Sequence, residues 1–204
     1  MPPSSLHGAR SPQPIRNDRA MDLERCVFHA RSSRNASADE LTSLSALAAS
    51  DPDAYADALS KYDDTPERRR LRDTWIPLVE AAWTDVVFLS PIRPHAIWRA
   101  WRSVAGVELP SLEFWAIPVD EIGHSVVFDR QITATGEPID QREVRAVDAK
   151  TYRSSRDTTN ANLQWITSLA RSNKRGAWFN GTPHVLTRGP VPLNSAVVID
   201  WRNP

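Results

Sequence analysis

Histidine, asparagine and arginine side chains gather in one short stretch of this 204-residue chain. His29 ends an apolar segment, Asn35 follows six residues later, and Arg31 and Arg34 lie between them. An imidazole exchanges protons near neutral pH, and a guanidinium group binds phosphate oxygens in a bidentate way. Such residues could serve a site for a polar or phosphorylated ligand. A histidine at the end of a strand is, however, more often a structural residue than a catalytic one, so this stretch by itself does not establish a site.

A second segment of interest joins a strand to a helix. Residues 86–98 read VVFLSPIRPHAIW, so that two prolines and Arg93 come directly after an apolar run. Proline has no amide hydrogen and cannot continue a central strand, which explains why SPxxP ends one element and begins another. The prolines do not explain Arg93, which lies where the end of a strand often faces a ligand.

Composition limits the class of protein. Apolar residues make up 41% and charged residues 25% of the chain, which is ordinary for a globular domain, and the net charge is zero. A nucleic-acid partner would therefore need a local basic patch. The single cysteine, Cys26, excludes an internal disulfide and fits a buried strand residue. Because no apolar run is long enough for a membrane helix or a signal peptide, we expect a soluble, cytoplasmic protein without a membrane partner.

Hydrophobic patterning predicts an α+β fold in a single domain over residues 23–204, after a disordered leader over residues 1–22. Interspersed helices and strands, with several strands in close succession near the end, are the basis of that class. The predicted strands cover residues 23–30, 83–89, 113–119 and 125–129, with two more around a Gly-Pro turn within 184–201. The predicted helices cover residues 37–60, 94–104 and 159–170, and residues 67–72 form a solvated helix end.

The first of these helices has specific end signals. Ser37 and Glu40 fit a capping box, and Asp51 with Pro52 breaks the helix and restarts it.

Several weak motifs follow one another in a consistent order. They are a histidine and an asparagine six residues apart (29–35), three arginines (68–70), Ile-Pro (76–77), the SPxxP region (85–94), FWAIPVDEI (114–122), SVVFDR (125–130) and TPHVLTRGPVP (182–192). This order resembles the DarT-type DNA ADP-ribosyltransferase family over residues 23–201, and the chain would be a divergent member. The resemblance implies an ADP-ribosyltransferase-like fold, with a mixed or antiparallel central sheet and flanking helices.

The resemblance also implies a reaction. The enzyme would consume NAD as a substrate and transfer ADP-ribose to a nucleobase, in DNA, as a toxin or phage-defence factor. Breaking the bond between nicotinamide and ribose develops positive charge on the ribose, so the site must orient NAD and stabilise that charge. Single-stranded DNA and an antitoxin would be the partners.

By the same resemblance, individual residues acquire roles. His29 and Asn35 would bind the nicotinamide end of NAD. Arg69, chosen from the three arginines at 68–70, would contact phosphate or the transferred ribose, as a cofactor-binding and catalytic residue. Ser90 and Arg93 would lie on the wall of the cleft and complete the cofactor site, with Trp98 and Trp101 packed beneath them.

One departure from the family concerns the catalytic carboxylate. The family carries a glutamate in its C-terminal strand, and this chain has His184 at the aligned position. A neutral imidazole can accept a proton, but it cannot stabilise positive charge as a carboxylate does. We expect His184 to lie on a strand beside the first strand and to face the same cleft as His29, as a catalytic base. The alternatives are a degenerate relative that binds nucleotide or nucleic acid without turnover, and transfer to a small molecule.

Other residue types suggest no further chemistry. The five histidines show no pairing with metal-ligand spacing, so no metal site is expected, and neither GxGxxG nor a Walker A motif occurs. Eight tryptophans are a high count. Those beside arginines could stack the bases of single-stranded nucleic acid, although core packing is the commoner use of tryptophan and is expected of four of them: Trp75, Trp83, Trp115 and Trp165.

Overall fold

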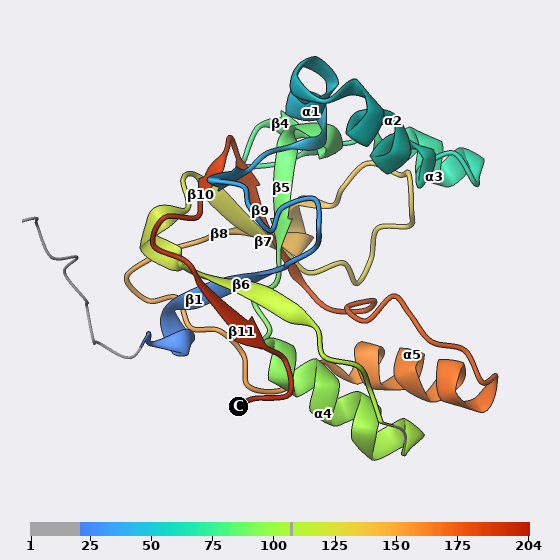
Figure 1. The fold of residues 1–204 in the computed structure, drawn as a ribbon. Coiled ribbons are helices and arrows are strands. Elements are labelled where there is room, and N and C mark those ends of the chain that lie inside the picture. The colour runs from blue at the N-terminus through green and yellow to red at the C-terminus, as the bar shows by residue number, and fades with distance from the viewer. Residues whose placement is uncertain (1–20, 107) are drawn as a thin grey trace, which may run out of the picture.

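Two antiparallel sheets form the centre of the molecule (Figure 1). The computed structural model describes residues 21–106 and 108–204. The three-stranded sheet has the order β1 (Cys26–Ala30), β6 (Glu113–Pro118), β11 (Val197–Asp200). The four-stranded sheet has the order β5 (Val86–Leu89), β9 (His184–Arg188), β7 (Ser125–Phe128), β8 (Val144–Ala146). One bridge, between Phe28 of β1 and Ser90 just after β5, connects the two sheets.

Shorter elements surround these sheets. Two-residue strands pair β2 (Glu40–Leu41) with β10 (Val191–Pro192), and β3 (Trp75–Ile76) with β4 (Ala81–Ala82). The α-helices are α1 (Leu44–Ser50), α2 (Pro52–Ser60), α3 (Pro66–Leu71), α4 (Pro94–Ala105) and α5 (Asn160–Arg171). Over residues 21–106 and 108–204, four short 3-10 helices complete the fold: η1 (Leu23–Arg25), η2 (Trp83–Asp85), η3 (Val119–Glu121) and η4 (Gln141–Glu143).

The core follows from the alternation of side chains along the strands. Val87, Leu89 and Val185 of the four-stranded sheet pack with Val27 and Ile117 of the three-stranded sheet. The opposite face of the four-stranded sheet forms a separate cluster, with Val86, Val126, Phe128 and Leu186 packed against Trp83. The four-stranded sheet is therefore covered on both faces, which explains why β5 and β7 are almost continuously apolar.

Helices α4 and α5 pack side by side at the end of the molecule opposite α1–α3 (Figure 1). Pro94 fits the first turn of α4, where its missing amide hydrogen has no cost. Ile97 and Trp101 share one face of that helix and pack on Ile166 and Trp201. The helix stops at Gly106, whose φ of 62° is the left-handed conformation that glycine adopts without strain.

The α+β prediction is confirmed at the level of helices with antiparallel sheet in one domain. Every pairing between named strands of residues 21–106 and 108–204 is antiparallel. Several boundaries differ from the prediction. The first three residues of the predicted strands at 23–30 and 83–89 form 3-10 turns instead. Of the predicted leader, residues 1–20 lie outside the described residues, and Asp22 caps η1 by accepting a hydrogen bond from Glu24.

The predicted capping box at the start of the first helix is wrong. Glu40 lies in β2, and Ser43 caps α1 by accepting a hydrogen bond from the Ala46 amide. Pairing with β10 holds this segment extended, and tertiary contacts thus override the local signal. The break at Asp51 is confirmed, since its carboxylate caps α2 through the Ala54 amide.

The strands around the Gly-Pro turn do not form a hairpin. β9 pairs with β5 and β7, whereas β10 pairs with β2, and a third strand, β11, pairs with β6. Within the described residues, no helix is both long enough and apolar enough to cross a membrane.

Candidate functional site

His29 lies where the two sheets separate. Phe28 and Ser90 exchange both backbone hydrogen bonds, at 2.9 and 2.7 Å, and this bridge is isolated: β1 and β5 show no further ladder pairing within the described residues. There the Nδ1 atom of His29 lies 2.9 Å from the carbonyl oxygen of Phe88. A carbonyl can only accept, so Nδ1 carries the proton and Nε2 is left as an acceptor in the neutral ring. Burial lowers the pKa of His29, which favours that neutral form.

Asn35 organises the loop that follows β1. Its amide nitrogen donates to the carbonyl of Ala30 at 3.0 Å, and its oxygen accepts from the Ser32 amide at 2.8 Å. The same oxygen also accepts from Nε1 of Trp115 at 3.4 Å. These bonds close a tight turn and hold the loop against β6. Asn35 is therefore a structural residue of this loop, whatever it also binds.

His29 and Asn35 line the same cavity, as the sequence spacing suggested. This cavity, called the His29 cavity below, has a volume of about 650 Å³ and lies between the loop after β1 and helices α1 and α2. Its size is within the range of roughly 300–1,000 Å³ that is typical of small-molecule sites. Its apolar wall comes from five side chains of the described residues: Ala38, Leu41, Leu47, Ala54 and Ala58.

Carboxylates dominate the charge of the His29 cavity. Its charged lining among the described residues consists of four carboxylates and a single cation, Arg34; the carboxylates are Glu40, Asp51, Asp53 and Asp57. The guanidinium group of Arg34 forms an ion pair with Asp57 and is thereby neutralised. The cavity is thus suited to a neutral or positively charged group, and it would repel a pyrophosphate.

Ser90 and Arg93 do not line the His29 cavity, contrary to expectation. The Ser90 hydroxyl is buried and bonds to both the amide and the carbonyl of Ile92, at 3.0 Å, which closes the turn after β5. Arg93 forms an ion pair with Glu24 at 3.5 Å and donates to the Ser154 hydroxyl at 3.3 Å. Both side chains therefore have structural roles in the region where β5, α4 and η1 meet.

The tryptophans of the segment after β5 are structural as well. Trp101 is fully buried in the α4–α5 core, and Trp98 stacks on His95 and contacts Arg102.

Arg69 lies on an exposed face of α3. Its neighbours are engaged: Arg68 pairs with Asp64, and Arg70 pairs with Glu67 and Glu137. The Arg69 side chain makes no hydrogen bond or ion pair to any of the described residues, and it is not part of the wall of the His29 cavity. The structure therefore does not bring Arg69 together with His29 and Asn35.

His184 occupies a different surface from the one expected. Its strand, β9, lies between β5 and β7, so β5 separates it from β1, and the expected adjacency is wrong. His184 is opposite Phe128 in the register and contacts the ring of Phe88 edge-on, at 6.0 Å between centroids. Because side chains alternate along a strand, this face is the one opposite Val185 and the core between the sheets, whereas His29 continues the Val27 face.

The environment of His184 keeps its ring uncharged. Burial, and then the nearby Arg130, lower its pKa to about 4. A group with such a pKa is neutral at pH 7 and a weak base. Because His184 and His29 also lie on different faces, the expected pair of these histidines in one cleft is not formed.

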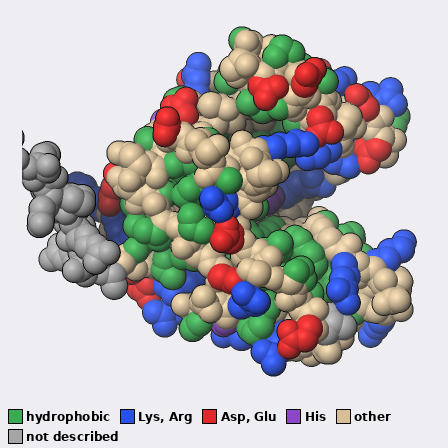
Figure 2. All heavy atoms as spheres, in the orientation of Figure 1, with side chains coloured by type: hydrophobic (Ala, Val, Ile, Leu, Met, Phe, Trp, Pro, Cys, Tyr) green, Lys and Arg blue, Asp and Glu red, His purple; other side chains and the backbone are tan. Residues whose placement is uncertain are grey.

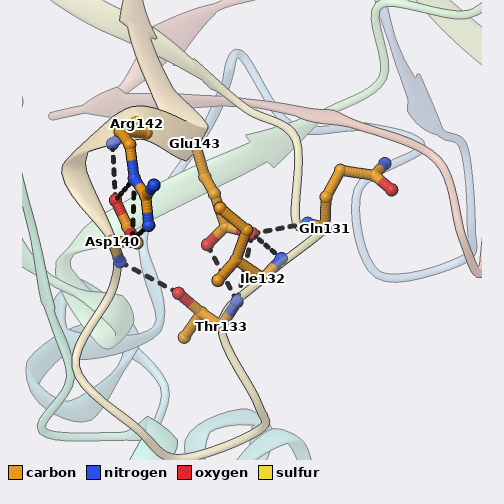
Figure 3. Close-up of polar contacts among 6 residues, drawn as sticks. All are labelled: Gln131, Ile132, Thr133, Asp140, Arg142 and Glu143. Atoms are coloured by element: carbon orange, nitrogen blue, oxygen red, sulfur yellow. Dashed lines mark hydrogen bonds and ion pairs between the residues drawn. The ribbon is translucent and has the colours of Figure 1, made fainter.

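A residue that the sequence did not single out fixes the segment next to His184. The buried carboxylate of Glu143 accepts hydrogen bonds from the backbone amides of Gln131, Ile132 and Thr133 (Figure 3). Burial alone would raise the pKa of Glu143, but these hydrogen bonds together lower it. These hydrogen bonds hold the backbone directly after Arg130 in place. A single glutamate in a polar stretch gives no pattern by which this role could be predicted.

The surface between the two helical ends of the molecule is hollowed (Figure 2). A notch separates the part of the surface over α1–α3 from the part over α4 and α5, and Lys or Arg side chains and a histidine lie on its inner wall. Among the described residues, no group of three or more histidine, cysteine, aspartate or glutamate side chains is arranged to hold a metal ion.

No family model, curated protein or solved structure matches this chain. Its function must therefore be inferred from the geometry above and from the motif order.

Proposed function

We propose that this chain has an ADP-ribosyltransferase-like fold and binds NAD through its nicotinamide end, without efficient transfer of ADP-ribose. The observation that carries the proposal is the convergence of His29 and Asn35 on one cavity of suitable size. The resemblance in motif order assigns these two residues to the nicotinamide end. Their positions at the junction of two sheets are compatible with that assignment.

The charge of the His29 cavity supports this orientation of the ligand. The nicotinamide ring of NAD⁺ is a cation, and the carboxylates of the cavity would attract it. The unprotonated Nε2 of His29 can accept a hydrogen bond from the carboxamide of the ring. The pyrophosphate would then extend out of the cavity, away from the carboxylates.

The residue at the family's glutamate position argues against efficient turnover. The ribose becomes positively charged as the nicotinamide leaves, and a carboxylate would stabilise it. His184 is neutral at pH 7 and faces away from His29, so it supplies no negative charge to such a ribose. We therefore favour binding of NAD without turnover over efficient transfer of ADP-ribose.

The test compares NAD⁺ with NADH, whose reduced ring is uncharged. Isothermal titration should show tighter binding of NAD⁺. His29→Ala should weaken NAD⁺ binding, by about tenfold for the loss of one good hydrogen bond.

Asp53→Asn should reduce the preference for NAD⁺, because Asp53 lines the cavity and has no ion pair within the described residues. Asp85→Asn, an exposed aspartate outside the cavity, is the matched control. Equal affinity for both cofactors, or unchanged NAD⁺ affinity in His29→Ala, would refute the nicotinamide assignment.

Transfer of ADP-ribose to a nucleobase of DNA is the second candidate, and a basic surface favours it. Arg102, Arg171, Lys174 and Arg175 lie at or just beyond the C-terminal ends of α4 and α5 and form no ion pair within the described residues. Such cations attract the phosphates of single-stranded DNA. The toxin or phage-defence role and an antitoxin partner follow from the resemblance alone. Transfer to a small molecule is a further acceptor class that the neutral net charge allows.

Product analysis separates the two candidates. Protein, NAD and single-stranded oligonucleotides are incubated together, and the oligonucleotides are searched for an added ADP-ribose by mass spectrometry. Nicotinamide release is measured in the same samples. Release with a modified oligonucleotide would establish transfer and overturn binding without turnover. Binding of NAD without release is the result that we expect.

A further inference from the structure

A second, smaller cavity lies on the other side of the four-stranded sheet from His184. Its volume is about 330 Å³, at the lower end of the range of roughly 300–1,000 Å³ for small-molecule sites. It forms where β7 and β8 meet the turn after β5, the segment before α5 and the residue before β9. It is called the Arg145 cavity below. The side chains used in the argument are Ile92, Val127, Arg145, Tyr152, Arg153 and Pro183.

Two arginines give this cavity a positive charge. Arg145 is directly opposite Val127 in the register of β8 and β7, so both side chains lie on the same face of the sheet. The Arg145 side chain makes no hydrogen bond or ion pair with any residue of 21–106 and 108–204. Arg153 donates from Nη1 to the Tyr152 carbonyl at 2.7 Å, and its remaining guanidinium hydrogens have no acceptor among the described residues.

The carboxylate content of the Arg145 cavity does not cancel this charge. Within the part of the chain that the structure describes, Asp157 is the single acidic residue that lines it, and it pairs with Arg99 at 2.6 Å. Two guanidinium groups without an ion pair therefore face this cavity, and none of its described lining residues is an unpaired carboxylate. This is the reverse of the His29 cavity, where several carboxylates accompany one neutralised arginine. Two arginines at one concave site are the arrangement that binds a phosphate through charge-assisted hydrogen bonds.

The rest of the Arg145 cavity has an apolar part beside three hydroxyl residues, Ser155, Thr158 and Thr159. Ile92 is buried at its floor, and Val127, Pro183 and the half-buried ring of Tyr152 complete it. The Tyr152 hydroxyl donates to the carbonyl of Cys26 at 3.2 Å, which fixes the ring in place. A ligand that fits must therefore combine an anionic group with a compact apolar or aromatic part.

We propose that the Arg145 cavity binds a small phosphate monoester that has an aromatic part, of the chemical class of a nucleoside monophosphate. The phosphate contacts Arg145 and Arg153, and the aromatic part packs on Tyr152 and Pro183. The site is separate from the His29 cavity, and the proposal does not depend on whether NAD binds there.

Titration calorimetry with AMP, adenosine and inorganic phosphate tests the site in the full-length protein. AMP should bind, and adenosine should bind at least about tenfold more weakly because it lacks the phosphate. Inorganic phosphate should also bind more weakly than AMP, because it leaves the apolar part of the cavity empty. Arg145→Gln and Arg153→Gln should each lower the affinity for AMP about tenfold.

Two controls locate the binding. Arg171→Gln removes the same charge from an exposed position of α5 outside the cavity and should leave AMP affinity unchanged. His29→Ala should also leave it unchanged, which distinguishes this site from the nicotinamide site. The proposal is overturned if AMP does not bind, if adenosine binds as tightly as AMP, or if both cavity variants bind AMP like the wild type. Equal weakening by Arg171→Gln would also overturn it, because the effect would then be one of overall charge.

Discussion

Replacing Glu143 by alanine removes an acceptor that three consecutive backbone amides share. These amides belong to Gln131, Ile132 and Thr133, and they stand at the start of the loop between β7 and η4 (Figure 3). The amide groups are partly buried, so water can replace the lost acceptor only in part. We expect the variant to fold, to be less stable, and to have a mobile loop.

The magnitude follows from the number of orphaned donors. An unsatisfied buried donor costs about 1–3 kcal/mol, and the lower value applies because these amides are only partly buried. Three donors would cost about 3 kcal/mol, and removal of a buried carboxylate returns some of its desolvation energy. The free energy of unfolding should therefore fall by about 2–3 kcal/mol in Glu143→Ala.

The matched control is Glu137→Ala in the same loop. Glu137 pairs with Arg70 at 3.4 Å, but both side chains are about half exposed. Exposed pairs contribute about 0–1 kcal/mol, so this variant should resemble the wild type. Urea unfolding at pH 7 gives the free energies, and hydrogen exchange of the three amides should accelerate in Glu143→Ala alone.

The pH dependence provides an independent check. The folded-state pKa of Glu143 is lowered, so its ionised form is favoured in the folded protein. Its stabilisation is therefore complete above the unfolded-state pKa, near ~4.3, and is lost as the pH falls through the folded-state value. The difference between the wild type and Glu143→Gln should accordingly shrink below about pH 4. A Glu143→Ala variant within about 0.5 kcal/mol of Glu137→Ala at pH 7 would refute this reasoning.

Three further predictions concern other parts of the fold. Gly136→Ala should destabilise the protein by at least about 2 kcal/mol in urea unfolding, because φ is +78° and a Cβ would lie 2.2 Å from the Glu67 carbonyl oxygen; wild-type stability would contradict this packing. Cys26 should resist alkylation at pH 8 in the folded protein, because burial raises its pKa to about 11; labelling as fast as after unfolding would argue against it. The pKa of His184 is about 4, so the folded state binds its proton less readily than the unfolded state, and stability should fall as the pH drops from about 6.5 to about 4. Over that pH range, the free energy of unfolding of His184→Gln, measured in thermal melts, should fall by up to about 3 kcal/mol less than that of the wild type. An identical pH profile of the two proteins would exclude a buried neutral ring.

Local chemistry in the sequence determined much of the secondary structure. Pro94 and Gly106 delimit α4, and the break at Asp51 separates α1 from α2. The apolar runs at 86–89 and 125–128 became strands of the four-stranded sheet because β-branched and aromatic side chains can be buried on both faces of a sheet. The six-residue spacing from His29 to Asn35 also had a local consequence, since a tight turn after β1 returns Asn35 to the cavity wall beside His29.

Burial of the tryptophans depended on tertiary context. Trp83 is buried as expected, but Trp75 is 58% exposed because its two-residue strand pairs only with β4 at the surface. The sequence pattern of a short strand does not reveal whether other elements will cover it or whether it will stay exposed at the surface.

Tertiary structure alone decided which face of a sheet each side chain occupies, and hence which residues meet in the site. A shift of one position in a strand moves a side chain to the opposite face, and sequence order does not reveal which strands become neighbours. The motif order led to the expectation that His184 and His29 share a cleft, but β5 lies between their strands and the register directs them to opposite faces. Arg93 likewise became structural because its partners, Glu24 and Ser154, are brought in from distant parts of the chain, whereas the Ser90 hydroxyl bonds to Ile92, two residues away. Hydrogen bonding and charge neutralisation act over a few ångströms in space, and those distances exist only once the chain has folded.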